Sequence, residues 1–104
     1  MTNLVLTRKA GQSVRLMING KATFCDILDV TGGSCQFRLT DVKANGVQTE
    51  NLRVERVRFR DSMQIAEGVS VLVVDLAKGY AKLNFTAPRD VHILRTELIK
   101  EAEA

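Results

Sequence analysis

The sequence predicts a small, mainly antiparallel β protein with a short helix at its C-terminal end. Three observations point to this class: short apolar segments of strand length, turn residues between them, and an internal repeat. The 104 residues are 45% hydrophobic and 26% charged, which is the composition of an ordinary globular protein. We therefore expect a single domain covering residues 1–104.

The internal repeat relates two stretches of the chain without a gap. Residues 25–41 (CDILDVTGGSCQFRLTD) align with residues 71–87 (VLVVDLAKGYAKLNFTA) at an offset of 46, and SVRL at 13–16 aligns with SMQI at 62–65. Two copies are too few for a solenoid. We expect two joined pseudo-repeats, about 1–53 and 54–104, because a half of this size is marginal for a core of its own.

The first half reads as a series of short strands separated by turns. Residues 4–9 and 13–18 are β-prone and flank a turn candidate at 10–12, which predicts a hairpin over 4–18. Asn19-Gly20 is a strong hairpin signal. Two further strands are expected at 22–30 and 35–40.

The second half begins with a segment of mixed pattern. Residues 48–60 (QTENLRVERVRFR) indicate either two short strands or one long strand with a kink near Glu55. Strands are then expected at 62–66 and 69–77, and the run 69–76 is apolar on both faces, which is typical of a strand buried on both sides.

The C-terminal end closes with two strands and a helix. Strands are expected at 80–86 and 91–94, separated by Pro88, because proline cannot join a central ladder. Residues 95–103 (RTELIKEAE) are good helix formers.

The composition excludes several classes of site. Cys25 and Cys35 align with the apolar Val71 and Ala81, which predicts two small buried thiols. Two cysteines and one histidine, not clustered, predict no metal site. No nucleophile–base pair, carboxylate dyad or phosphate loop is present, so we expect no enzyme, no catalytic residue and no cofactor.

The charge permits an anionic partner without demanding one. The net charge is +3 and the pI is about 9.1. The N-terminus lacks the basic and apolar regions of a signal peptide, and no apolar run is long enough to span a membrane. We expect a cytoplasmic protein with no membrane partner.

Both ends of the chain resemble one family, the carbon storage regulators (CsrA, also called RsmA). LVLTRKAGQSVRL resembles the opening of that family, with Gln12 in place of the usual Glu. VSVLVVDLAKGYAKLNFTAPRDVHILRTELI resembles its remainder, with Leu94 in place of the frequent His and Thr96 in place of a Glu. The matching residues are Leu4, Leu6, Thr7, Arg8, Lys9, Gly11, Ser13, Ala87, Pro88, Arg89, Asp90, Val91, Arg95, Glu97 and Leu98.

The resemblance implies interleaved antiparallel sheets of the CsrA type and a role as an RNA-binding translational regulator. Members of the family are homodimers that recognise GGA-containing hairpin loops in mRNA leaders or small RNAs. Each site combines the first strand of one subunit with the last strand of the other. In this chain those strands are expected to meet and form one intact site. A second site, pairing residues 47–53 with 56–60, is expected to be a relic.

The same resemblance implies which residues bind RNA. They are Leu6, Thr7, Arg8, Lys9, Ala87, Pro88, Arg89, Val91, His92, Ile93, Leu94 and Arg95. We expect Arg95 to be the dominant contact and Arg8 the next, because arginine suits bidentate contact with guanine or phosphate. Ala87 and Pro88 would form a flat ledge for a base, and 91–94 would offer backbone groups.

Two alternatives stay open. The chain could be a protein-interaction paralogue that modulates a two-site homologue without binding RNA itself. Its state could be a pseudo-dimeric monomer or a homodimer. Tyr80, beside the turn glycine Gly79, could stack on a base or serve only in packing.

Overall fold

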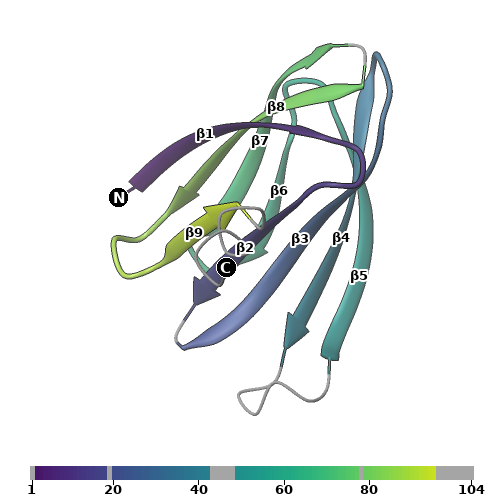
Figure 1. Ribbon diagram of the computed structural model, residues 1–104. Helices are drawn as coiled ribbons and strands as arrows, with labels where there is room; N and C mark the ends of the chain where they lie inside the picture. Colours follow the sequence, from purple (N-terminus) through teal and green to yellow (C-terminus); the bar gives the residue numbers. More distant parts are fainter. Residues whose placement is uncertain (1, 19, 43–48, 78, 96–104) are drawn as a thin grey trace, which may run out of the picture.

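The computed structural model describes residues 2–18, 20–42, 49–77 and 79–95, and within them every regular element is a β-strand. Nine strands form two sheets (Figure 1). Their bounds are β1 (Thr2–Lys9), β2 (Ser13–Ile18), β3 (Lys21–Val30), β4 (Ser34–Val42), β5 (Thr49–Arg58), β6 (Ser62–Ala66), β7 (Val69–Ala77), β8 (Tyr80–Ala87) and β9 (His92–Arg95). The helix expected at 95–103 lies outside the described residues, except that Arg95 belongs to β9.

The two halves of the chain exchange strands. The four-stranded sheet has the order β1-β8-β7-β6, so its β1 comes from the other half of the chain. The five-stranded sheet has the order β5-β4-β3-β2-β9, so its β9 comes from the second half and its β5 spans the boundary between the halves. All neighbouring strands are antiparallel. The interleaved antiparallel architecture predicted from the sequence is confirmed.

The hairpin predicted over 4–18 is wrong, because β1 and β2 belong to different sheets. The turn between them redirects the chain: the Gln12 N–H donates to the Lys9 carbonyl (3.0 Å), and Gly11 has φ of 93°. The Gly11 N–H donates to the Ile27 carbonyl (2.8 Å), which ties the turn to β3. A propensity reading finds the strands and the turn, but not the sheet to which each strand belongs.

The turn between β5 and β6 repeats this geometry. The Asp61 N–H donates to the Arg58 carbonyl (2.9 Å), and the Arg60 N–H donates to the Val73 carbonyl (2.8 Å). Arg60 has a positive φ of 65°, as Gly11 does at the equivalent place. Here too the chain passes from one sheet to the other.

The repeat extends to the irregularities of the sheets and to the core. The register shifts between Ile27 and Asp29 in one sheet and between Val73 and Asp75 in the other, which are positions 46 residues apart. Repeat-equivalent residues are also buried together. They are Cys25 and Val71, Ile27 and Val73, Cys35 and Ala81, Phe37 and Leu83, and Leu39 and Phe85. The expected boundary between residues 53 and 54 falls inside β5.

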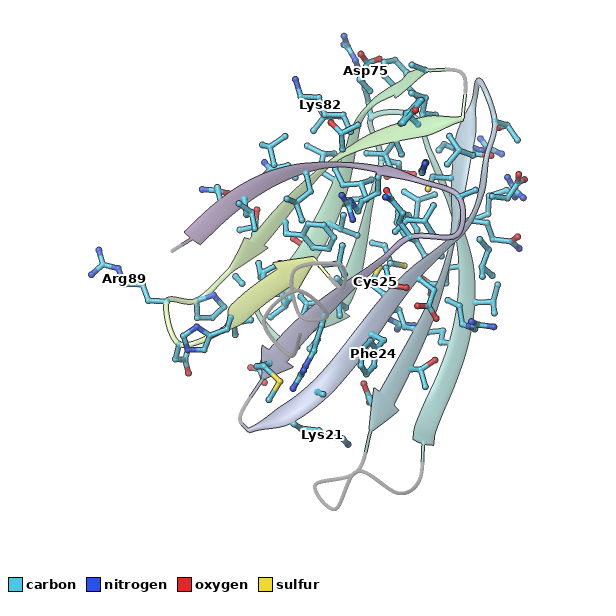
Figure 2. All side chains as sticks on the ribbon, in the orientation of Figure 1. Lys21, Phe24, Cys25, Asp75, Lys82 and Arg89 are labelled. Carbon is cyan, nitrogen blue, oxygen red and sulfur yellow. The ribbon has the colours of Figure 1, made fainter. Side chains whose placement is uncertain are left out.

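A single apolar core contains residues of both sheets. Cys25 and Cys35 are buried in it as free thiols, as predicted, and Figure 2 shows Cys25 in the interior. The expectation that β7 is buried on both faces is wrong. Val71 and Val73 are fully buried, whereas Leu72 between them is 37% exposed, because it points to the outer face of the sheet, which no described element covers.

No helix among the described residues is long and apolar enough to cross a membrane.

Burial affects both thiols. It raises the pKa of Cys25 strongly, and the neighbouring Cys35 and Asp26 add to that rise. It raises the pKa of Cys35 to about 11, against a lowering by Arg56 and a further rise from Asp29. Both groups are therefore protonated and unreactive at neutral pH.

The first prediction concerns these thiols. A raised pKa contributes stability that is fully present below the unfolded value near 9.0 and is lost as pH rises through the folded value of about 11 for Cys35. The double variant Cys25→Val, Cys35→Ala introduces the residues of the second copy. We expect it to fold and to lose less stability than the natural chain between neutral pH and about pH 10.5, measured by urea unfolding. Equal losses in both proteins would contradict the assignment.

The second prediction concerns the two turns. A Cβ at Gly11 would meet no atom within 4 Å, so the cost of Gly11→Ala comes from the positive φ alone, about 1 kcal/mol. Arg60→Gly at the equivalent position relieves the strain of the positive φ, but glycine also gives the unfolded chain more conformational freedom. Because these two effects offset each other, we expect no loss in the free energy of unfolding. Urea unfolding of the two variants checks both. A loss above about 1 kcal/mol for Arg60→Gly would show that its side chain holds the turn.

Candidate nucleic-acid interface

The candidate site lies on two edge strands, β1 and β9. Strand β1 pairs only with β8, and β9 pairs only with β2, among the strands the structure describes. Each therefore has one edge of backbone N–H and C=O groups without a strand partner. In Figure 1, β9 and the start of β1 lie on the left, β1 runs across to the right, and β5 lies on the right.

The register brings the two ends of the chain to the same flank. Thr2 lies opposite Ala87, so the start of β1 is next to the segment that leads into β9. The backbone of Arg95 lies opposite Val14, two residues beyond the turn that follows β1. Strand β1 is thus held in place by β8, and β9 is held in place by β2.

Along β1 the expected residues alternate between the interior and the surface. Leu6 is buried in the core, and Arg8 is only 5% exposed, with its Nε donating to the Thr7 carbonyl (2.9 Å). Thr7 and Lys9 are exposed. A contact between Arg8 and RNA stays a prediction, and it requires the side chain to turn outward. The alternation places Thr7 and Lys9 as the accessible side chains of this strand.

The second group of expected residues divides in a similar way. Ala87 and Val91 are buried, while Pro88 and Ile93 are half-buried. Arg89 and His92 are exposed, and Figure 2 shows Arg89 projecting away from the body of the protein. A turn in which the Val91 N–H donates to the Pro88 carbonyl (3.1 Å) leads into β9. The backbone of Leu94 and Arg95 lies in β9; their side chains lie outside what the structure describes.

The pairing of β1 with β8 adds two residues to this surface. Lys9 lies opposite Tyr80, and Thr7 lies opposite Lys82. Tyr80 is 49% exposed and Lys82 is exposed as well. Lys82 was absent from the predicted set. The alternation of residues 80–86 predicts that Lys82 points to the outer face of its strand. The register of β1 against β8 is needed to show that Thr7 and Lys9 lie on the same face of the sheet.

The opposite flank is built differently. Residues 49–58 form the single strand β5, so the prediction that 47–53 faces 56–60 in a second site is wrong: 49–53 and 56–58 follow each other in one strand, and 47 and 48 lie outside the described residues. This outcome matches the alternative of one long strand, but the irregularity in its pairing lies between Glu50 and Arg53 and not near Glu55.

The edge strand β6 also differs from its counterpart β2. Strand β2 carries β9 on its outer edge, whereas the outer edge of β6 carries no strand among the described residues. The Nη2 of Arg53 donates instead to the Gln64 carbonyl (2.7 Å). A depression of about 350 Å³ lies beside this edge, lined by Ser62, Gln64, Gly68, Val69, Ser70 and Thr86.

In the described part of the chain, no three His, Cys, Asp or Glu side chains gather in a way that could hold a metal ion.

Comparison with known proteins adds a relationship by sequence. The second half, residues 56–104, matches the CsrA family, described as the global regulator protein family. The translational regulator CsrA of Campylobacter jejuni subsp. jejuni is 42% identical over 43 residues, which cover 41% of this chain and 57% of that protein. The translational regulators CsrA of Clostridium novyi and Clostridium kluyveri are also 42% identical over 43 residues, covering 60% and 59% of their lengths.

The match thus spans less than two thirds of these curated relatives. No solved structure matches the chain significantly. The matched residues run from the end of β5 through β9 and beyond, and they include the expected segment 87–95. Residues 56–104 are thus similar to the CsrA family of global regulators.

Proposed function

We propose that this protein is an RNA-binding post-transcriptional regulator that takes up one GGA-containing hairpin loop per chain, from an mRNA leader or a small RNA. The observation that carries the proposal is the position of β1 and β9. They come from opposite ends of the sequence, carry the family-like residues, and form edges of the two sheets, with the start of β1 opposite Ala87, in the segment that leads into β9.

The chemistry of this flank suits a single-stranded loop. Sequence-specific RNA recognition usually targets unpaired bases, whose edges are exposed. The backbone edges of β1 and β9 that pair with no described strand supply donors and acceptors for the edges of such bases. Lys9, Lys82 and Arg89 are exposed cations for phosphates, and the exposed ring of Tyr80 is a stacking surface for a base. Arg95 is proposed to read a guanine by a bidentate contact.

The proposal of one site per chain rests on an internal duplication. The repeated turns, bulges and core positions support the inference that two pseudo-repeats are joined in one chain. The flank formed by β5 and β6 lacks a described counterpart of β9, and β5 lacks the Thr-Arg-Lys sequence of β1. Binding of one loop over a ribosome site would block translation, or the chain would compete with two-site homologues for their RNAs.

One observation favours the alternative of a protein-interaction paralogue. The outer edge of β6 offers backbone groups to which a strand of a two-site homologue could add. Solution mass, measured with a GGA hairpin and with such a homologue in turn, separates the two functions. RNA binding by the isolated chain favours the regulator, and association with the homologue without RNA binding favours the paralogue.

The third prediction concerns stoichiometry. Titration of the chain with a hairpin that carries a single GGA should give one RNA per chain by calorimetry, with a dissociation constant of micromolar or tighter, about −8 kcal/mol or more favourable. A hairpin whose GGA is changed to CCA is the control. Two hairpins per chain would contradict the single site, and no binding of either RNA would contradict the function.

The fourth prediction separates base reading from phosphate contact. Arg95→Ala should weaken binding by about 1–3 kcal/mol and reduce discrimination against the control hairpin, because a bidentate base contact is lost. Lys9→Ala and Lys82→Ala should each lower the salt slope of log K by about 0.7 without changing discrimination.

Lys21→Ala is the matched control for these lysine variants. Lys21 lies at the far end of the molecule from Lys82 in Figure 2. An equal effect of Lys21→Ala on the salt slope would show that only net charge matters, and would remove the proposed phosphate contacts.

A further inference from the structure

The turn that joins β5 to β6 exposes an aromatic ring between two arginines. Phe59 is 43% exposed, and the guanidinium carbon of Arg60 lies 5.2 Å from the centre of its ring. At the equivalent place after β1 the chain has Ala10 and Gly11. The repeated backbone geometry shows that the fold needs neither the ring nor the guanidinium to form this turn.

The arginines of β5 and its turn fall into two groups. Arg53 has an ion pair with Glu55 (3.8 Å), and Arg56 has one with Asp29 (3.2 Å). No side-chain hydrogen bond or ion pair to Arg58 or Arg60 occurs within the described part of the chain. These two exposed cations therefore keep their charge available for a ligand.

The backbone of Arg60 is strained for a residue with a side chain. Its φ of 65° lies in the left-handed region, which glycine enters at no steric cost. The other copy has glycine at this position, so the turn itself does not require an arginine there.

The turn is held in place although its side chains are exposed. The Phe59 N–H donates to the Gly33 carbonyl (3.0 Å), and the Arg60 N–H donates to the Val73 carbonyl. The first bond ties the turn to the five-stranded sheet, because Gly33 directly precedes β4. The second ties it to the four-stranded sheet, because Val73 lies in β7. The ring and the two guanidinium groups thus project from an ordered support, which limits the entropy lost when they bind a ligand.

We propose that Arg58, Phe59 and Arg60 form a second RNA contact that binds single-stranded RNA of any sequence. A base stacks on the exposed ring of Phe59, and the two arginines contact the phosphates. Stacking on an aromatic ring tolerates every base, because each has a π face, and arginines beside the ring follow the backbone. This surface lies where β5 passes to β6, away from the edges of β1 and β9, so it would hold the strand that flanks a bound loop.

The inference takes its ligand class from the proposed function, and the experiment tests the two separately. Three fluorescent RNAs are compared by anisotropy: a GGA hairpin without flanks, the same hairpin with single-stranded uridine flanks, and an oligouridine. The proteins are the natural chain, Arg60→Gly, Phe59→Ala and the control Arg38→Ala. Arg38 is an exposed arginine of β4 that pairs with Asp26, so its loss gives the same change in charge elsewhere.

We expect the flanks to strengthen hairpin binding by the natural chain. Arg60→Gly and Phe59→Ala should each weaken binding of oligouridine and of the flanked hairpin by about tenfold. Arg60→Gly should also lower the salt slope for oligouridine by about 0.7. Binding of the hairpin without flanks should stay unchanged, and Arg38→Ala should resemble the natural chain. Since Arg60→Gly relieves the strained φ, a loss of binding by a stably folded variant cannot come from a loss of the fold.

Three results would overturn the inference: flanks that add no affinity, an effect of Arg60→Gly no larger than that of Arg38→Ala, or equally effective competition by a polyglutamate of matched charge. The last would mark a general anion site. Failure of the hairpin without flanks to bind, with oligouridine binding still lost in Arg60→Gly, would instead remove the proposed GGA site and support this contact.

Discussion

The structure depends on the two places where the chain leaves one sheet and enters the other. Each is a three-residue turn with a positive φ at its centre, tied by the backbone to a strand of the sheet that the chain is leaving or joining. Because of these turns, β1 joins the strands of the second half and β5 joins those of the first. The apolar faces of both sheets then pack against each other in one core. Each half of the chain contributes residues to this core, and strands of both halves are needed to bury them.

The same exchange decides which backbone edges are left open. Among the strands that the structure describes, four lie at sheet edges: β1 and β6 in one sheet, β5 and β9 in the other. The β1 and β9 flank combines open backbone with exposed cations and Tyr80. The β5 and β6 flank has no counterpart of β9 among the described residues. Its Arg53 and Arg56 contact carboxylates or a carbonyl, whereas Arg58 and Arg60 do not within the described part of the chain. Two nearly equivalent halves thus present two flanks of different chemistry.

Much of the fold could be predicted from the sequence, because its information is local. The strand segments, their turns and the buried pairs such as Phe37 and Leu83 follow from apolar spacing and from the repeat. The sheet to which β1 belongs could not be derived in the same way, since the hydrogen bonds from Gly11 to Ile27 and along β8 join residues distant in sequence. The exposed Leu72 was missed because apolar residues on an uncovered face resemble those of a core.

The candidate site was predictable as a set of segments, but only partly as a set of side chains. The resemblance identified both ends of the chain, and the register brings those ends together. It could not show that Arg8 turns inward while Lys9 faces outward, because that depends on which face of β1 meets the core. Lys82 was not predicted as a site residue for the same reason. It belongs to this surface only because it lies opposite Thr7 in the pairing of β1 with β8.

One consequence follows from β8 pairing with β1 and β2 pairing with β9 inside a single polypeptide. In an obligate dimer, strands that meet across subunits separate on dilution, so the folded fraction depends on how much protein the cell contains. Here the same strands meet by closure of a covalent loop, whose entropic cost grows only slowly with its length. The pairing that builds the β1 and β9 surface is therefore intramolecular and does not weaken on dilution.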